Sequence, residues 1–166
     1  MLIDEGKKTR VVYVTLLIIS LTWLGSIFAA PLLIATGHFT ASTIIYQSFS
    51  VVCHQMADRS FHILGFPLGV CSRCSAIYTG FVAGLMCYPF VRDISQETLP
   101  GRTWLIVSSI PMLIDLIGGF TGLYPSTFFS RSATGLIFGL TTAFYILPGF
   151  VSLSMHKEQN KETVYE

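Results

Sequence analysis

The apolar and polar positions divide the chain into long apolar runs separated by short polar stretches. Residues 11–57 contain no Lys, Arg, Asp or Glu. At ~1.5 Å per helical residue, this run is too long for one crossing of a ~30 Å hydrocarbon core. The chain must therefore bend, and Pro31 and Gly37 predict that a first spanning helix over residues 11–36 ends there.

The next segment, residues 42–56, predicts an amphipathic helix. One face carries Ile45, Phe49, Val52 and Met56, and the opposite face carries Thr43, Gln47, Ser48 and Ser50. We expect this helix to lie in the membrane interface or to re-enter the membrane, because its polar face is unsuited to lipid.

Three further apolar runs predict spanning helices over residues 74–91, 103–120 and 132–153. The polar stretch 92–102 and the turn-rich stretch 122–126 separate them. The predicted fold class is therefore all-α: one integral membrane domain over residues 1–166, with four transmembrane helices and one amphipathic or re-entrant helix. The N-terminal run is too long for a removable signal peptide, and residues 156–166 are expected to form a short solvated or disordered tail.

Composition supports a membrane protein, since 52% of the residues are hydrophobic and only 11% are charged. The formal net charge is +1, which gives no general attraction to nucleic acid. Membrane lipid is therefore the expected partner. A chain of this size also leaves room for a homo-oligomer or for a partner in a membrane complex.

Basic residues predict the orientation, because short cytoplasmic loops retain Lys and Arg. With four crossings, both termini are cytoplasmic in the cell (inner) membrane, and the basic residues divide seven inside to three outside. A fifth crossing at residues 42–56 would reduce this to six against four. The inner set is Lys7, Lys8, Arg10, Arg92, Arg102, Lys157 and Lys161, and the outer set is Arg59, Arg73 and Arg131.

Small residues at four-residue spacing predict which helices pack closely, because they let helix backbones approach in lipid. One such stripe consists of Ala76, Gly80 and Gly84, and another consists of Gly135 and Gly139. We therefore expect the helices at 74–91 and 132–153 to be in contact.

Candidate chemistry is concentrated in a segment predicted to lie on the outer side. Cys71 and Cys74 have the two-residue spacing of zinc ligands, and Cys53 and His54 would complete a tetrahedral site. Binding by two adjacent residues is awkward, so His62, Asp115, water or a substrate are alternative fourth ligands. Cys87 lies ~20 Å from Cys74 along a helix and is expected to be a small buried hydrophobic residue.

Two other interpretations of the cysteines stay open. Cys71 and Cys74 could form a redox dithiol with Cys53 as exchange partner, in outline similar to quinone-linked disulfide oxidoreductases and vitamin K epoxide reductases. Those enzymes generally use two cysteine pairs, and the outer region here has three cysteines. Alternatively, a structural disulfide or structural metal could hold the loop in a non-enzymatic scaffold or subunit of a membrane complex.

Charged residues near the cysteines favour an anionic ligand. Asp115 is expected near the outer leaflet, where it either pairs with Arg73 or Arg131 or has a functional role. Three arginines beside a metal would suit a phosphate-bearing lipid or another anionic amphiphile. Asp115 and His54 are the candidate catalytic residues, and the predicted anion-binding or supporting residues are Arg59, Arg73, Arg131, Gln55 and Tyr78.

The order of several short motifs resembles a widespread prokaryotic family of small membrane proteins of unknown function. The resemblance covers most of the chain after residue 45 and implies a shared outer-face site without naming a reaction. Ser75-Ala76 and Gly119 depart from the family pattern, in which Thr-Gly and Gln are expected. The motifs are Cys53-His54-Gln55, Arg59-Ser60-Phe61, Gly65-Phe66-Pro67, Cys71-Ser72-Arg73-Cys74, Ile77-Tyr78-Thr79-Gly80, Pro111-x-x-x-Asp115 and Arg131-x-x-Thr134-Gly135.

Overall fold

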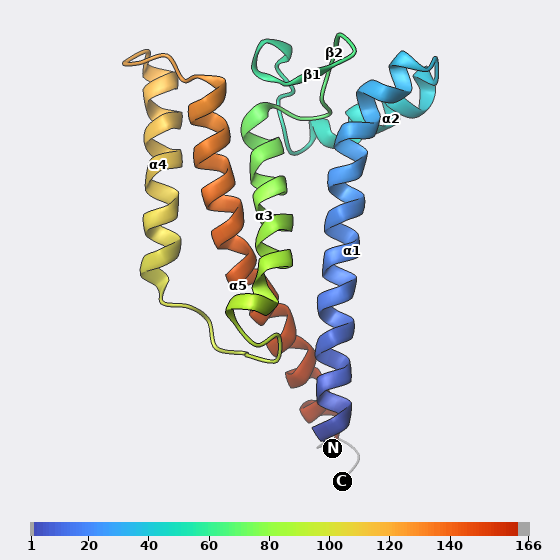
Figure 1. The fold of residues 1–166 in the computed structure, drawn as a ribbon, viewed down its shortest axis with the longest axis vertical. Coiled ribbons are helices and arrows are strands. Elements are labelled where there is room, and N and C mark those ends of the chain that lie inside the picture. Colours follow the sequence, from blue (N-terminus) through green and yellow to red (C-terminus); the bar gives the residue numbers. More distant parts are fainter. Residues whose placement is uncertain (1, 163–166) are drawn as a thin grey trace.

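Four long helices run side by side along the length of the protein (Figure 1). The computed structural model describes residues 2–162, with side chains described for residues 6–155. The long helices are α1 (Leu2–Ala35), α3 (Ser72–Val91), α4 (Arg102–Thr121) and α5 (Phe128–Glu162). Each contains a stretch long and apolar enough to cross a membrane, which confirms the predicted four spans.

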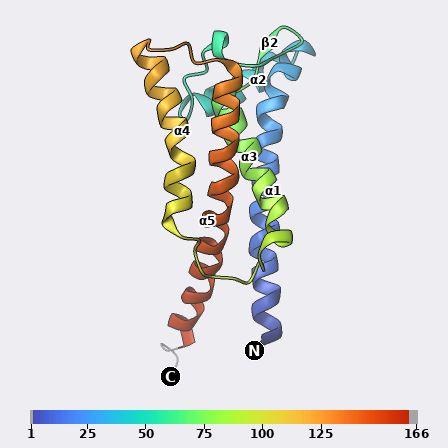
Figure 2. The same ribbon diagram turned by 60° about the vertical axis from the view of Figure 1, so that its left-hand side comes forward.

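The start of α1 and the end of α5 lie at one end of the bundle, and the segment between α1 and α3 lies at the other (Figures 1 and 2). α5 continues as a helix to Glu162, where a disordered tail was expected from residue 156. The Lys, Glu and Gln residues of this stretch all favour helix. The remainder of the predicted tail, residues 163–166, lies outside the described residues.

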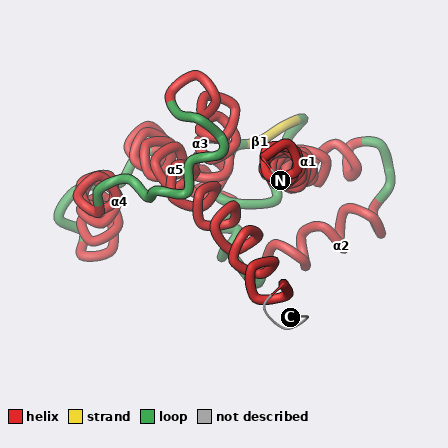
Figure 3. Tube along the Cα trace, turned by 90° about the horizontal axis from the view of Figure 1, so that it is seen from below, coloured by secondary structure: helices red, strands yellow, loops and turns green. Residues whose placement is uncertain are grey.

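The amphipathic helix is shorter than predicted and lies obliquely across the end of the bundle (Figures 1 and 3). α2 spans Phe39–Ser50, so the predicted C-terminal boundary at residue 56 is wrong. The chain leaves the helical path after Ser50, and the backbone turns at Gln55, which has a φ of 50°. On the other side of α2, the buried Ser42 hydroxyl donates to the Ala30 carbonyl at 2.7 Å and ties α2 to α1.

A short 3₁₀ helix, η1 (Ala57–Arg59), and a two-stranded hairpin, β1 (His62–Ile63) with β2 (Phe66–Pro67), lead into α3. Both hairpin turn residues, Leu64 and Gly65, have positive φ, which matches the twist of the strands. The Gly69 N–H donates to the Ile27 carbonyl at 3.2 Å, so the segment after the hairpin is fixed to α1. The core beneath it consists of Ile27, Phe49, Cys53, Leu68 and Val70.

α3 and α5 form the closest helix pair, as the small-residue stripes predicted. A Cβ atom at Gly139 would lie 2.0 Å from the Ile77 carbonyl oxygen, and one at Gly80 would lie 2.3 Å from the Leu136 carbonyl oxygen. These glycines therefore allow the two backbones to touch directly. Beyond this seam, a second buried apolar cluster consists of Leu85, Tyr88, Ala143, Leu147 and Val151.

Candidate metal centre

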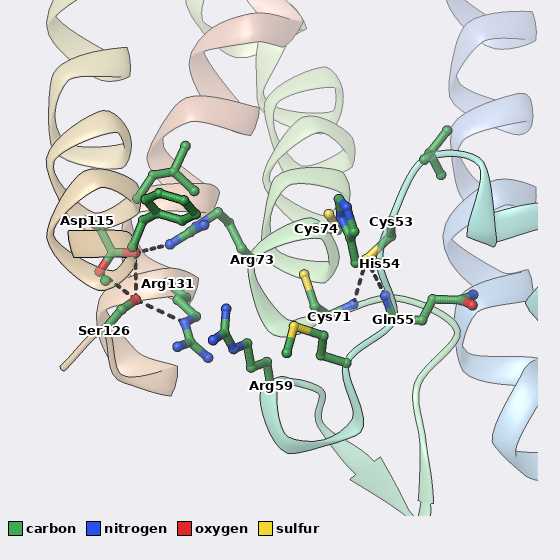
Figure 4. Close-up of a pocket in the computed structure, with 15 residues that line it drawn as sticks. Cys53, His54, Gln55, Arg59, Cys71, Arg73, Cys74, Asp115, Ser126 and Arg131 are labelled. Atoms are coloured by element: carbon green, nitrogen blue, oxygen red, sulfur yellow. Dashed lines mark hydrogen bonds and ion pairs between the residues drawn. The ribbon is translucent and has the colours of Figure 1, made fainter. Parts of the chain in front are cut away.

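Three cysteines from two separate segments meet at the end of α3 (Figure 4). The Sγ atoms of Cys53, Cys71 and Cys74 all lie within 4.8 Å of one another and could hold a metal ion. Cys53 follows α2, and the other two occupy the first turn of α3. Sulfurs bound to one zinc ion at ~2.3 Å in tetrahedral geometry lie about 3.8 Å apart. The three thiols are thus near the spacing that a metal requires.

The turn after Cys53 aims backbone donors at its sulfur. The N–H of Gln55 lies 3.4 Å from the Cys53 Sγ, and the N–H of Cys71 lies 3.3 Å from it. Such hydrogen bonds stabilise a metal-bound thiolate. Cys53 itself is only 6% exposed, so its sulfur has few other donors.

The Gln55 side chain holds this turn in place. Its amide nitrogen donates to the Tyr46 carbonyl at 2.8 Å and to the Gly69 carbonyl at 2.7 Å. A positive φ at a residue with a side chain costs roughly 1–2 kcal/mol, and the two hydrogen bonds offset that cost. Gln55 therefore connects α2 to the segment between β2 and Cys71.

Cys71 caps the N-terminus of α3. A hydrogen bond with the Cys53 thiol, and then one with the Cys74 thiol, lowers the pKa of the Cys71 thiol. The backbone N–H groups of Cys74 and Arg73 lower this pKa further, while burial opposes the shift. The thiolate, which is the form that binds metal and attacks disulfides, is thus favoured at this position.

A cavity of about 510 Å³ opens beside the cysteines. It contains the three thiols on one side and the polar residues of α4 and α5 on the other (Figure 4). Its apolar walls include Leu116 and Phe120, which are 49% and 92% exposed on α4. The other lining residues are Val52, His54, Gln55, Met56, Arg59, Arg73, Asp115, Gly119, Ser126 and Arg131.

Asp115 is buried at the far side of this cavity, with 2% of its surface exposed. Its carboxylate forms an ion pair with Arg73 of α3. It also accepts hydrogen bonds from the Ser126 hydroxyl at 2.9 and 3.0 Å and from the Ser130 hydroxyl at 2.6 Å. A buried carboxylate with this many donors is stable as the anion. Of the two predicted pairings, the structure shows Arg73, and Arg131 instead donates from Nε to Ser126 Oγ at 2.9 Å.

Two arginines of the cavity have spare hydrogen-bonding capacity. Within the described part of the chain, Arg131 has no acceptor other than Ser126. Arg59 makes one loose contact with Asp58, at 3.7 Å, and both side chains are about half exposed or more. Arg131 and Arg59 lie close together between Asp115 and Cys71 (Figure 4). The cavity therefore has an excess of positive charge that Asp115, already paired with Arg73, does not neutralise.

Comparison with known proteins agrees with this picture. A family described as predicted membrane proteins, DUF2085, matches residues 53–145. The chain belongs to this family. The matched region begins at Cys53 and includes every residue of the cavity wall except Val52.

Two archaeal relatives are named as uncharacterised proteins. One, from Methanocaldococcus jannaschii, is 38% identical over 150 residues, which cover 87% of this chain and 96% of the relative. The other, from Methanothermobacter thermautotrophicus, is 29% identical over 100 residues, covering 60% of this chain and 88% of the relative. No solved structure matches the chain. The family assignment of the sequence motifs is thus confirmed, and it brings no known reaction with it.

The remaining predicted residues are placed as follows. His54 lines the cavity but is not part of the group of mutually close ligand atoms. His62 is exposed in β1. Tyr78 is not among the lining residues of the cavity, and its ring packs against Trp23 at 6.0 Å. Cys87 is exposed on α3, so the prediction that it is buried is wrong; it faces outward from the bundle.

Sequence reasoning missed Ser126 and Ser130, which complete the Asp115 network. Serines are common at helix starts, so neither carries a distinctive signal alone. The clue was their position: both lie in the turn and first residues that precede Arg131, opposite a carboxylate that required partners.

Proposed function

We propose that this protein binds zinc through Cys53, Cys71 and Cys74 at the extracytoplasmic face of the cell membrane and acts there on an anionic amphiphile. The observation that carries the proposal is the convergence of three thiols, within 4.8 Å, on a cavity shared with arginines. Thiolate ligands suit zinc. The predicted distribution of Lys and Arg supports the extracytoplasmic orientation.

Bound zinc with three protein ligands would supply a Lewis acid at its remaining coordination position. His54 is proposed either as the fourth ligand or as the group that transfers a proton, because it lines the cavity next to Cys53. Asp115 is poorly suited to accept a proton, since its ion pair and its serine hydrogen bonds stabilise the anion. We therefore assign Asp115 to positioning of Arg73, Ser126 and, through Ser126, Arg131.

The arginines support the anionic part of the ligand. Arg131 is oriented by its Nε hydrogen bond to Ser126, which leaves its terminal nitrogens for an acceptor. The Nε of Arg73 is buried without a partner among the described residues and adds a further donor. Guanidinium groups bind phosphate and carboxylate in a planar, bidentate manner. The exposed apolar side chains Leu116 and Phe120 border the same cavity and suit the apolar part of an amphiphile.

Metal analysis combined with thiol counting tests the metal site. The full chain, purified in detergent, should contain stoichiometric zinc, and its thiols should titrate as reduced under denaturing, non-reducing conditions. Cys53→Ser, Cys71→Ser and Cys74→Ser should each lose most of the zinc. Cys87→Ser is the matched control and should retain it.

The same measurement also tests the alternative of thiol–disulfide exchange. The closeness of the three sulfurs is equally compatible with a Cys71–Cys74 disulfide and Cys53 as exchange partner. Absence of metal together with a reducible Cys71–Cys74 bond would overturn the zinc proposal and favour this activity. If the serine variants retain zinc and change only folding yield, a scaffold is favoured.

Cobalt substitution tests whether an anion reaches the metal. We expect the visible absorption of the cobalt protein to change when decyl phosphate is added, and not when decyl maltoside is added. Arg131→Gln and Arg59→Gln should each weaken the decyl phosphate response about tenfold, the value of one charge-assisted hydrogen bond. If decyl phosphate leaves the visible absorption of the cobalt protein unchanged, the metal is structural.

A further inference from the structure

The connection from α3 to α4 lies at the opposite end of these helices from the cysteines (Figure 2). A second cavity is lined by residues of this connection and of the helices beside it. Its volume is about 460 Å³. Four of its seven lining residues belong to spanning segments of α3, α4 and α5, so it opens at the edge of the apolar part of the bundle. The lining residues are Val91, Arg92, Pro100, Gly101, Trp104, Thr141 and Phe144.

Arg92 is the only charged residue among those that line this cavity. Its guanidinium has a hydrogen-bond partner for one terminal nitrogen but not for the other. One terminal nitrogen, Nη2, donates to the Thr98 hydroxyl at 3.3 Å. The other, Nη1, is buried and has no acceptor among the described residues. The neighbouring carboxylate of Asp93 accepts the Ser95 N–H at 2.8 Å, and among the described residues it forms no ion pair with Arg92. Arg92 therefore has a buried donor beside an open space.

Tyr88, one helical turn before Arg92, has a buried hydroxyl without a partner among the described residues. Its ring packs against Phe144, with centroids 5.0 Å apart, and Phe144 lines the cavity. An unsatisfied buried donor costs roughly 1–3 kcal/mol. Tyr88 itself does not line the cavity, so the unpaired donor that borders the open space is that of Arg92, and a phosphate offers acceptor oxygens to it.

The cavity walls indicate where this phosphate comes from. Trp104 lies in the first turn of α4 and is 70% exposed. This position is typical of the aromatic belt at the membrane interface. The Tyr145 hydroxyl donates to the Gly101 carbonyl at 2.7 Å and fixes the loop that forms the rim. A basic pocket between spanning helices at this depth is suited to an anionic lipid headgroup, with its chains beside the exposed apolar wall.

We propose that this second cavity binds the phosphate of an anionic phospholipid in the leaflet nearest the chain termini, through Arg92. The site is separate from the cysteine cavity and independent of the proposed zinc function. It would anchor the loop between α3 and α4 to the membrane surface.

Quenching of Trp104 by brominated lipids tests the proposal. The chain contains two tryptophans, so the full-length Trp23→Phe variant leaves Trp104 as the reporter. In nanodiscs, brominated phosphatidylglycerol should reach half-maximal quenching at a mole fraction about tenfold below that of brominated phosphatidylcholine. Equal quenching by the two lipids would overturn the proposal without any substitution in the cavity.

Variants in the Trp23→Phe background test the residues. Arg92→Gln should abolish the preference for phosphatidylglycerol. Arg102→Gln, which removes an exposed arginine at the same end, is the matched control and should keep the preference. An unchanged preference in Arg92→Gln would contradict the assignment. Inorganic phosphate should leave the quenching unaltered, and displacement of the brominated lipid by it would instead identify a site for free phosphate.

Discussion

The α3–α5 seam and the cysteine cavity are both built on α3, yet they use opposite kinds of contact. In the seam, glycines bring two backbones together without polar side chains. At the cavity, α4 packs on α5 and is linked to α3 through the buried pair of Arg73 and Asp115. The seam is closed by direct backbone packing, whereas the cavity is lined by charged and polar side chains. A fixed seam allows a polar cavity to exist in a membrane bundle, because the charges do not have to hold the helices together alone.

The sharpest way to break this comparison is to separate the seam. Gly139→Leu would force a side chain against the Ile77 carbonyl, so we expect a loss of at least about 3 kcal/mol of folding free energy. Zinc content and the phosphatidylglycerol preference should fall together, since both sites depend on α3. Thermal unfolding in detergent measures the effect. Gly149→Ala, where a Cβ atom meets nothing within 4 Å, should be near neutral.

Breaking the charge pair should have the next largest effect. Asp115→Asn leaves Arg73 buried without a counter-charge, and we expect a cost of about 3 kcal/mol. Arg73→Met combined with Asp115→Leu should recover part of this loss, because apolar replacements leave no unpaired charge. A double-mutant cycle by thermal unfolding gives the coupling free energy. If the losses of the single variants Arg73→Met and Asp115→Leu simply add in the double variant, the pair does not join α3 to α4.

Gln55→Ala separates local geometry from global stability. It removes the two side-chain hydrogen bonds that hold the turn after Cys53, so we expect zinc affinity to fall 10- to 100-fold, as for other residues that orient metal ligands. The unfolding free energy should change by only about 1–2 kcal/mol. Competition with a chelator measures the affinity. Gln47→Ala, an exposed glutamine of α2, is the control and should leave it unchanged.

Arg131→Gln should have the smallest effect on stability, below about 1 kcal/mol, because the arginine is partly exposed and loses one hydrogen bond to Ser126. We expect this substitution to weaken mainly anion binding, which the decyl phosphate titration measures. A large loss of stability in this variant would mean that Arg131 supports the fold instead of the ligand.

The helices and their closest packing followed from sequence because both depend on regular spacing. Long apolar runs predicted four spans, and the spacing of Gly80 and Gly139 with other small residues predicted the seam. The end of α2 did not follow, because the polar and apolar pattern continues past Ser50 while the chain turns. That turn is decided by contacts of Gln55 with Tyr46 and Gly69, which are distant in sequence.

The candidate site was only partly predictable. The spacing of Cys71 and Cys74 indicated ligands, and the depth of Asp115 indicated a partner, but sequence did not choose between Arg73 and Arg131. Ser126 decides this, since it binds the carboxylate and also holds Arg131 away from it. Which arginine pairs with Asp115 depends on side-chain geometry across three helices, and no periodic sequence pattern indicates it.

The cysteine cluster also has a consequence for the order in which the protein is made. Cys53, Cys71 and Cys74 fall within 22 consecutive residues, all of which precede the second spanning helix or open it. Asp115 and Arg131 are synthesised later, with α4 and α5. Because synthesis proceeds from the N-terminus, the thiols can meet while the ribosome is still producing the last two helices. The half of the cavity that holds the cysteines can therefore form before the half that holds Asp115 and Arg131 packs against it.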